Sequence, residues 1–203
     1  MDKYKVSVII PVYNQEKLVI KAIESVPTRD DVEVIVIDDA STDNTYKNVQ
    51  DYANEHLDKN IIILSNSENK GVAYTVNKGY DNAKGLYVVL LGSDDYFYTD
   101  KFIEIMQQLD GTDMVYFNLQ INNGDIWQLT NDNKGFCCGS VKFMRKEFVG
   151  NTRCLDVPAG EDYYFFVELL NKKPTEKFTD ITVKHYNYPR ENSLSNLRTR
   201  GCI

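Results

Sequence analysis

The chain has 203 residues, of which 42% are hydrophobic and 26% charged, a composition typical of one ordinary globular domain. Its net charge of -7 and the absence of a basic face argue against nucleic acid as a partner. The apolar runs are too short to cross a bilayer, and the N-terminus lacks the features of a signal peptide. We therefore expect a cytoplasmic protein without an integral membrane segment.

The acidic residues are concentrated in the first half of the chain. Residues 1–110 hold 11 Lys and Arg against 19 Asp and Glu, whereas residues 111–203 hold 12 against 11. An acidic protein that binds an anionic ligand needs a metal ion or a few well-placed cations. The four cysteines match no zinc-binding spacing and are expected to be free thiols in a reducing compartment: Cys137, Cys138, Cys154 and Cys202.

Short apolar runs alternate with amphipathic segments over the first hundred residues. The apolar runs predict strands at residues 5–10, 32–37, 61–64 and 86–91. The segments between them predict helices at residues 16–26, 45–53 and 72–83. Continuous apolar strands separated by helices indicate a mostly parallel sheet with helices on both faces.

The pattern changes in the second half. Residues 114–121 and 126–129 flank Asn122-Asn123-Gly124, which is a strong hairpin signal. A helix is predicted over residues 161–171 and a last strand near residues 181–188. We therefore expect a single α/β domain, in which residues 1–100 form a Rossmann-like nucleotide-binding half and residues 101–203 add a smaller mixed half to the same sheet.

Polar residues follow three of the predicted strands at the point where each strand ends. Residues 11–14 follow the first strand, Asp38-Asp39 the second and Asp94-Asp95 the fourth. Ligands of open parallel sheets bind at this carboxyl edge. Adjacent carboxylates repel unless a cation offsets them, and oxygen ligands suit Mg²⁺ or Mn²⁺ together with a diphosphate. One Asp-Asp pair alone would more often form a turn or a helix cap, but two pairs favour a binding site.

These motifs, in this order, resemble the family 2 inverting glycosyltransferases with the GT-A fold. The resemblance covers residues 5–100 well and the remainder in patches. Its carriers are residues 6–14 (VSVIIPVYN), residues 34–45 (VIVIDDASTDNT), the block at residues 69–85, Ser93-Asp94-Asp95 and Gly160-Glu161-Asp162. No G-x-G-x-x-G or P-loop motif is present, which disfavours a dehydrogenase or a P-loop enzyme.

The resemblance implies a role for each matching residue of the donor site. Pro11, Val12 and Tyr13 would line the nucleoside base, and Asp39 would hydrogen-bond the base, commonly uracil. Asp94 would lie near the ribose and the donor sugar.

The resemblance also implies how the diphosphate and the acceptor are handled. Asp95 would bind the Mn²⁺ or Mg²⁺ ion that bridges the diphosphate, and Asp162 would be the general base. Arg190 and Ser193 are candidates for phosphate contacts. The motif Ser-Asp-Asp has one carboxylate fewer than the commoner Asp-x-Asp, so a modest metal affinity is expected. GT-A enzymes often add a C-terminal histidine to the metal, but His185 is at least as well explained as a strand residue.

The expected activity is metal-dependent inverting transfer of a hexose from a nucleotide-sugar, most commonly a UDP-sugar, to an acceptor hydroxyl. The acceptor would be a glycan, a lipid-linked sugar or a protein, as in polysaccharide biosynthesis. Two other classes remain open at this point: a nucleotidyltransferase, and a non-catalytic module or subunit that binds a nucleotide-sugar or a glycan. The transferred sugar, the acceptor and the oligomeric state are not determined by the sequence.

Overall fold

The computed structural model describes residues 3–134, 140–158 and 160–189 of the chain. Its first half contributes four parallel strands in the order β3-β2-β1-β4, as the apolar runs predict. The bounds of these strands are β1 Tyr4–Val12, β2 Val32–Asp38, β3 Asn60–Ser65 and β4 Gly85–Leu90. All four strands run in the same direction, so their carboxyl ends share one edge of the sheet.

The second half extends the same sheet with mixed pairing, in the order β8-β6-β9-β5 after β4. Strand β8 is antiparallel to both β4 and β6, whereas β6 and β9 are parallel. The bounds are β5 Tyr96–Phe97, β6 Met114–Ile121, β7 Ile126–Trp127, β8 Lys142–Arg145 and β9 Glu176–Tyr186. Although β5 ends this order, the Phe97 N–H donates to Ser25 Oγ at 3.0 Å, so the sheet curls back towards its first half.

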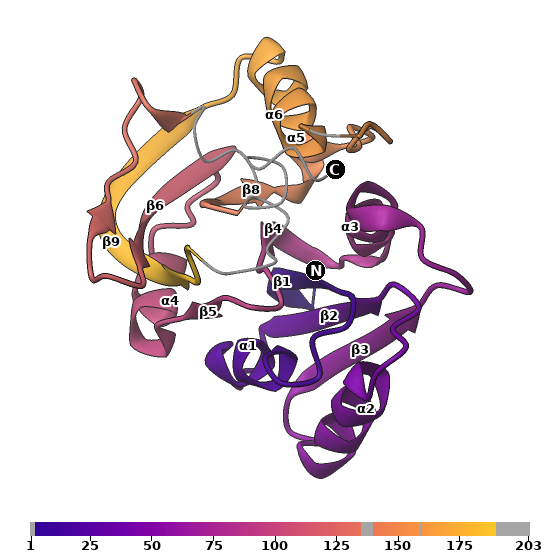
Figure 1. Ribbon diagram of the computed structural model, residues 1–203. Coiled ribbons are helices and arrows are strands. Elements are labelled where there is room, and N and C mark those ends of the chain that lie inside the picture. Colours follow the sequence, from indigo (N-terminus) through magenta and orange to yellow (C-terminus); the bar gives the residue numbers. More distant parts are fainter. Residues whose placement is uncertain (1–2, 135–139, 159, 190–203) are drawn as a thin grey trace.

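Helices cover both faces of the sheet (Figure 1). One face carries α1 (Val19–Ser25), α2 (Thr45–Glu55) and α4 (Thr99–Met106), and the other carries α3 (Gly71–Asn82), α5 (Lys146–Val149) and α6 (Glu161–Asn171). Successive strand residues point to opposite faces, so β1 places Val8 and Ile10 in one core cluster and Ile9 in the other.

Helix α3 lies unusually close to the parallel strands because of Gly79. A Cβ atom at this position would be 2.3 Å from Cγ2 of Ile9, a distance that no side chain tolerates. The glycine thus allows the helix to pack directly on β1, in agreement with the predicted helix over residues 72–83.

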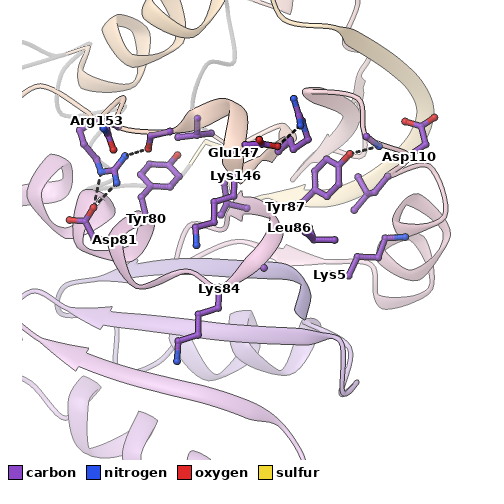
Figure 2. A pocket seen from close by; sticks show the side chains of 18 residues that line it. Lys5, Tyr80, Asp81, Lys84, Leu86, Tyr87, Asp110, Lys146, Glu147 and Arg153 are labelled. Carbon is purple, nitrogen blue, oxygen red and sulfur yellow. Dashed lines mark hydrogen bonds and ion pairs between the residues drawn. The ribbon is translucent and has the colours of Figure 1, made fainter. Parts of the chain in front are cut away.

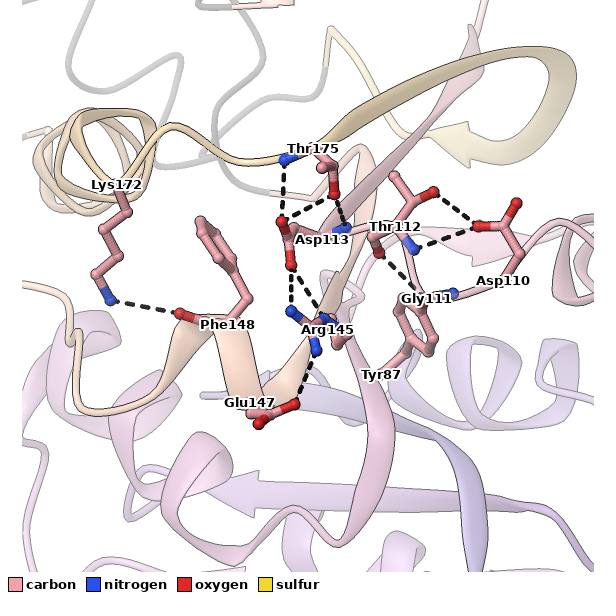
Figure 3. A network of polar contacts seen from close by, with 10 residues as sticks. All are labelled: Tyr87, Asp110, Gly111, Thr112, Asp113, Arg145, Glu147, Phe148, Lys172 and Thr175. Carbon is pink, nitrogen blue, oxygen red and sulfur yellow. Dashed lines mark hydrogen bonds and ion pairs between the residues drawn. The ribbon is translucent and has the colours of Figure 1, made fainter.

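The second half of the fold is held by a polar network around Asp113 (Figure 3). Asp113 Oδ2 accepts hydrogen bonds from the N–H and hydroxyl groups of Thr175 at 2.9 and 2.8 Å. Its Oδ1 accepts from Arg145 Nη2 at 2.6 Å. The carboxylate therefore joins the starts of β6 and β9 to the end of β8.

Most predicted elements are confirmed, and the differences have physical reasons. Helix α1 begins at Val19 rather than at residue 16, because the preceding residues form the loop that closes the carboxyl edge. Strand β8 was not predicted, since its short run carries Lys142, whose side chain is nevertheless buried. Helix α4 was also missed. Strand β9 begins at Glu176 rather than near 181, where pairing with β6 extends it.

Candidate functional site

The loops after β1 and β2 are joined at the carboxyl edge of the sheet. The Asp39 N–H donates to the Val12 carbonyl at 2.8 Å, and Asn14 Oδ1 accepts from the Thr42 N–H at 2.8 Å. Within this edge Pro11 is half-buried and Val12 is buried, while Tyr13 is 42% exposed. The aromatic face of Tyr13 is therefore available to a ligand.

Both carboxylate oxygens of Asp39 accept hydrogen bonds from this chain. Its Oδ1 accepts from Asn66 Nδ2 at 2.7 Å and from the Lys70 N–H at 2.9 Å, and its Oδ2 accepts from the Gly71 N–H at 2.9 Å. Gly71 adopts a φ of 82°, which glycine allows at little cost, and this turns its N–H towards the carboxylate. Asp39 thus satisfies the first N–H groups of α3. Its expected contact with a nucleoside base stays a prediction.

Asp38, the first residue of this pair, has one carboxylate oxygen that accepts a hydrogen bond from the described part of the chain and one that does not. Its Oδ2 accepts from the Ser41 N–H at 3.0 Å. Its Oδ1 is buried and has no hydrogen-bond partner within the described part of the chain. A buried acceptor left unpaired costs about 1–3 kcal/mol, which an N–H group of a ligand would recover.

Asp95, the expected metal ligand, also accepts hydrogen bonds from this chain. Its Oδ2 pairs with the Lys184 ammonium at 3.0 Å, and its Oδ1 accepts from the Asn187 N–H at 2.9 Å. The side chain is 4% exposed, and that of Lys184 is 1% exposed. Each oxygen of Asp95 therefore already has one donor from this chain. The role of Asp95 as a metal ligand stays a prediction.

Asp94 is half-buried, and both carboxylates of this motif border the space left by the missing side chain of Gly92. A Cβ atom at Gly92 would lie 2.9 Å from Asp95 Oδ2. A Cβ atom at Gly92 would lie 3.1 Å from Asp94 Oδ1. Among residues 3–134, 140–158 and 160–189, no group of three or more metal-binding side chains gathers. An ion at Asp94 would therefore take its other oxygens from a bound diphosphate.

His185 lies on β9, and its ring Nδ1 is buried without a hydrogen-bond partner in the described part of the chain. It follows Lys184 along the strand, so its side chain points to the opposite face. Its ring stacks on Tyr96 with a centroid distance of 4.5 Å, and the Lys21 ammonium lies 3.6 Å from the centre of the Tyr96 ring. Burial, followed by the charge of Lys21, lowers the pKa of His185. These contacts support its interpretation as a strand histidine.

Asp162 lies in the first turn of α6 and is half-buried. Burial, followed by the charges of Glu161 and Asp162, raises the pKa of the Cys154 thiol to about 12. Cys154 is held against α3 by Asn77, which exchanges two hydrogen bonds of 2.8 Å with its backbone. The start of α6 is therefore fixed beside the helix that Asp39 caps.

A pocket of about 980 Å³ lies elsewhere, at the amino ends of β1 and β4 (Figure 2). Lys5, Tyr80, Lys84 and Leu86 are among its lining residues, and none of the predicted site residues is. It is therefore separate from the carboxyl edge.

Some predicted site residues lie outside the described part of the chain, and some side chains at the carboxyl edge were not predicted. Arg190 and Ser193 lie outside the described residues. Sequence reasoning missed two side chains: Asp38 lay within a quoted motif without a role, and Lys184 gave no signal because its partner Asp95 is 89 residues away. No helix in the described ranges is both long and apolar enough to span a membrane.

Known proteins resemble this chain in sequence and in structure. The family model described as glycosyl transferase family 2 matches residues 7–156. The UDP-Glc:alpha-D-GlcNAc-diphosphoundecaprenol beta-1,3-glucosyltransferase WfaP of Escherichia coli is 36% identical over 115 residues, which are 56% of this chain and 44% of WfaP. The structure of S. aureus TarS 1–349 in complex with UDP-GlcNAc has a TM-score of 0.81 at 22% identity and covers 94% of this chain.

A second solved structure supports the same fold. The mannosyltransferase PcManGT from Pyrobaculum calidifontis, in complex with GDP-Man and Mn²⁺, has a TM-score of 0.75 at 20% identity and covers 97% of this chain. This chain spans 60% of both solved chains. The predicted GT-A fold is thereby confirmed. Since the family model covers about three quarters of the sequence, the chain belongs to glycosyl transferase family 2.

Proposed function

We propose that this chain is the catalytic domain of an inverting glycosyltransferase that moves a hexose from a nucleoside diphosphate sugar to an acceptor hydroxyl. A UDP-sugar is the proposed donor, because the names of WfaP and of the TarS complex both refer to UDP-linked sugars. The observation that carries the proposal is the unpaired, buried oxygen of Asp38 at the carboxyl edge of β2.

The nucleoside base would be recognised by the loops after β1 and β2. Asp38 Oδ1 would accept the ring N–H of uracil, which replaces the missing partner of a buried acceptor. The exposed ring of Tyr13 would stack on the base. Pro11 and Val12 would line the base next to Tyr13. A base without a ring N–H at that position would leave the acceptor unpaired and bind more weakly.

The diphosphate would be bound at the loop after β4. Asp94 would hold Mn²⁺ or Mg²⁺ there, and the bound ion would neutralise the charge that develops on the leaving nucleoside diphosphate. Arg190 and Ser193 would contact the phosphates.

The acceptor would be activated from the first turn of α6. Asp162 would take the proton of the attacking hydroxyl group while the bond to the anomeric carbon forms on the face opposite the leaving group. A glycan or a lipid-linked sugar is the proposed acceptor class, in line with the diphosphoundecaprenol acceptor in the name of WfaP.

Calorimetric titration with UDP, with and without Mn²⁺, tests the donor site. Asp38→Asn leaves one carbonyl oxygen for two donors, the Ser41 N–H and the base, so UDP affinity should fall by about 10- to 100-fold. Asp51→Asn, an exposed change on α2, is the matched control and should leave the affinity unchanged. Equal UDP affinity of the wild type and Asp38→Asn would refute the base contact, and absence of binding to any nucleoside diphosphate would refute the function.

A further inference from the structure

Three aromatic side chains gather where β6 and β9 end. The rings of Tyr186 and Tyr188 are stacked, with centroids 5.5 Å apart and an angle of 8° between their planes. The Trp127 ring lies against both, with its centroid 6.2 Å from that of Tyr186 and 5.7 Å from that of Tyr188. We refer to Trp127, Tyr186 and Tyr188 as the aromatic cluster. All three side chains are half-buried, so part of each remains open to a ligand.

The directions of the strands place the aromatic cluster at the carboxyl edge. Strand β8 is antiparallel to both β4 and β6, so β6 runs in the same direction as β4, and β9 is parallel to β6. Asn187, which lies between the two tyrosines, donates its N–H to Asp95 Oδ1 at 2.9 Å. The Cα atom of each tyrosine is one residue, about 3.8 Å, from that of Asn187. The cluster is therefore next to the acidic motif after β4.

The aromatic cluster also lies on the face of the sheet that α6 covers. Its rings pack against the core to which Phe165 and Phe166 of α6 belong. The end of α6 is at the amino edge, where Lys172 Nζ donates to the Val149 carbonyl at 3.1 Å, shortly after β8 ends. The opposite end of the helix, with Asp162 in its first turn, is therefore directed towards the carboxyl edge.

The segment that carries the two tyrosines is fixed to the hairpin that carries Trp127. Asn122, directly after β6, donates from Nδ2 to Asn187 Oδ1 at 3.1 Å and to the Pro189 carbonyl at 3.2 Å. Its N–H donates to the Tyr188 carbonyl at 3.2 Å. The rings are therefore held in place before a ligand arrives, which reduces the conformational entropy lost on binding.

Aromatic rings that are half-open to solvent suit a sugar ring as their ligand. A pyranose presents C–H groups on its faces and hydroxyl groups around its rim. The C–H groups pack on an aromatic surface, while the hydroxyl groups stay available to polar groups and to water. Packing on the core accounts for the buried side of the cluster, and a stacked sugar would cover the open side.

We propose that the aromatic cluster is the acceptor subsite, where a pyranose ring of the acceptor stacks and presents a hydroxyl group to Asp162. This inference rests on the proposed function, because it names the side chains that bind the acceptor of that reaction. The acceptor is then a saccharide, free or attached to a carrier, and not the hydroxyl group of a protein side chain.

The fluorescence of Trp127 tests the proposal directly, since the chain contains one tryptophan. The wild type is titrated, with and without UDP and Mn²⁺, with the methyl glycosides of glucose, galactose and N-acetylglucosamine, and with cellobiose and chitobiose. A peptide rich in serine and threonine is titrated in the same way. At least one saccharide should give a saturable change in emission, because a stacked sugar replaces water at the indole.

Variants of Tyr188 separate stacking from packing. Tyr188→Leu keeps an apolar side chain against the core but has no flat ring, so the affinity for the bound saccharide should fall by about 10-fold. Tyr188→Phe keeps the ring and should bind within about twofold of the wild type. Tyr52→Ala is the matched control, because Tyr52 is half-buried, stacks on His56 at 3.9 Å and packs on the opposite face. It should leave the saccharide affinity unchanged.

Three results would overturn the inference. They are the absence of a saturable change with every saccharide in both conditions, a response to the peptide without one to the saccharides, and wild-type saccharide affinity in Tyr188→Leu. If the wild type binds no nucleoside diphosphate, the proposed function fails. The titrations without nucleotide still decide in that case whether the aromatic cluster binds a sugar.

Discussion

At the residue scale, the two members of each aspartate pair differ in burial and in hydrogen bonding. The second residue of each pair, Asp39 or Asp95, is buried and has donors from this chain on both oxygens. Of the first residues, Asp38 has a buried oxygen without a partner in the described part of the chain, and Asp94 is half-buried. One carboxylate of each pair therefore holds the loop in place, and the other is proposed to meet the ligand.

The loop that carries Asp38 also contains local backbone strain at Ala40. Its φ of 59° lies in the left-handed region, which costs an ordinary L-residue roughly 1–2 kcal/mol and a glycine much less. We expect Ala40→Gly to raise the free energy of unfolding by about 0.5–1 kcal/mol, measured by urea denaturation. The same change within α2, Ala53→Gly, should lower it by about 1 kcal/mol, and a destabilising Ala40→Gly would contradict the prediction.

At the element scale, the ends of the strands are fixed by buried polar groups as much as by the apolar core. Asp113 joins β6, β8 and β9, and Asn77 joins α3 to the segment that leads into α6. Burial alone would raise the pKa of Asp113, but hydrogen bonds from Thr175 and Arg145 outweigh it and hold the pKa below its ordinary value. The carboxylate is therefore more stable ionised in the folded protein than in the unfolded chain.

The pH dependence of stability follows from that lowered pKa. The contribution of Asp113 is fully present above the unfolded pKa of 3.8 and is lost as the pH falls through the lower folded value. Asp113→Asn should lower the free energy of unfolding by about 2–3 kcal/mol at pH 7. As the pH falls from about 5 to about 2, the variant should lose less stability than the wild type. Urea unfolding at several pH values measures this, with the exposed Asp132→Asn as control. If Asp113→Asn loses as much stability at low pH as the wild type, the ionised Asp113 carboxylate does not contribute to the pH dependence of stability.

At the scale of the whole molecule, the parallel half and the mixed half meet across α3 and α6. Both helices cover the same face of the sheet, and Tyr80 of α3 stacks on Phe165 of α6 with ring centres 5.3 Å apart. Binding of the donor is proposed for the first half and activation of the acceptor for the second. The two functions should therefore be separable by mutation.

Asp162→Asn tests that separation. The variant should reduce the rate of sugar transfer by about 100- to 10,000-fold, because an amide cannot accept the proton of the acceptor. Its affinity for UDP should remain that of the wild type, as measured by the same titration. Glu168→Gln, an exposed change on the same helix, should affect neither quantity. Full transfer activity in Asp162→Asn would exclude it as the base, and no transfer by the wild type would favour a binding module.

The sequence by itself determined the parallel half, the hairpin at residues 122–124 and the gathering of polar residues at the carboxyl edge, because strand periodicity and turn residues are local signals. Which donors these aspartates meet was decided only by the tertiary structure. The partners of Asp39 begin 27 residues further along the chain, and Lys184 is 89 residues from Asp95. Two adjacent carboxylates are alike in a sequence, and the donors that the fold brings to each of them make them different.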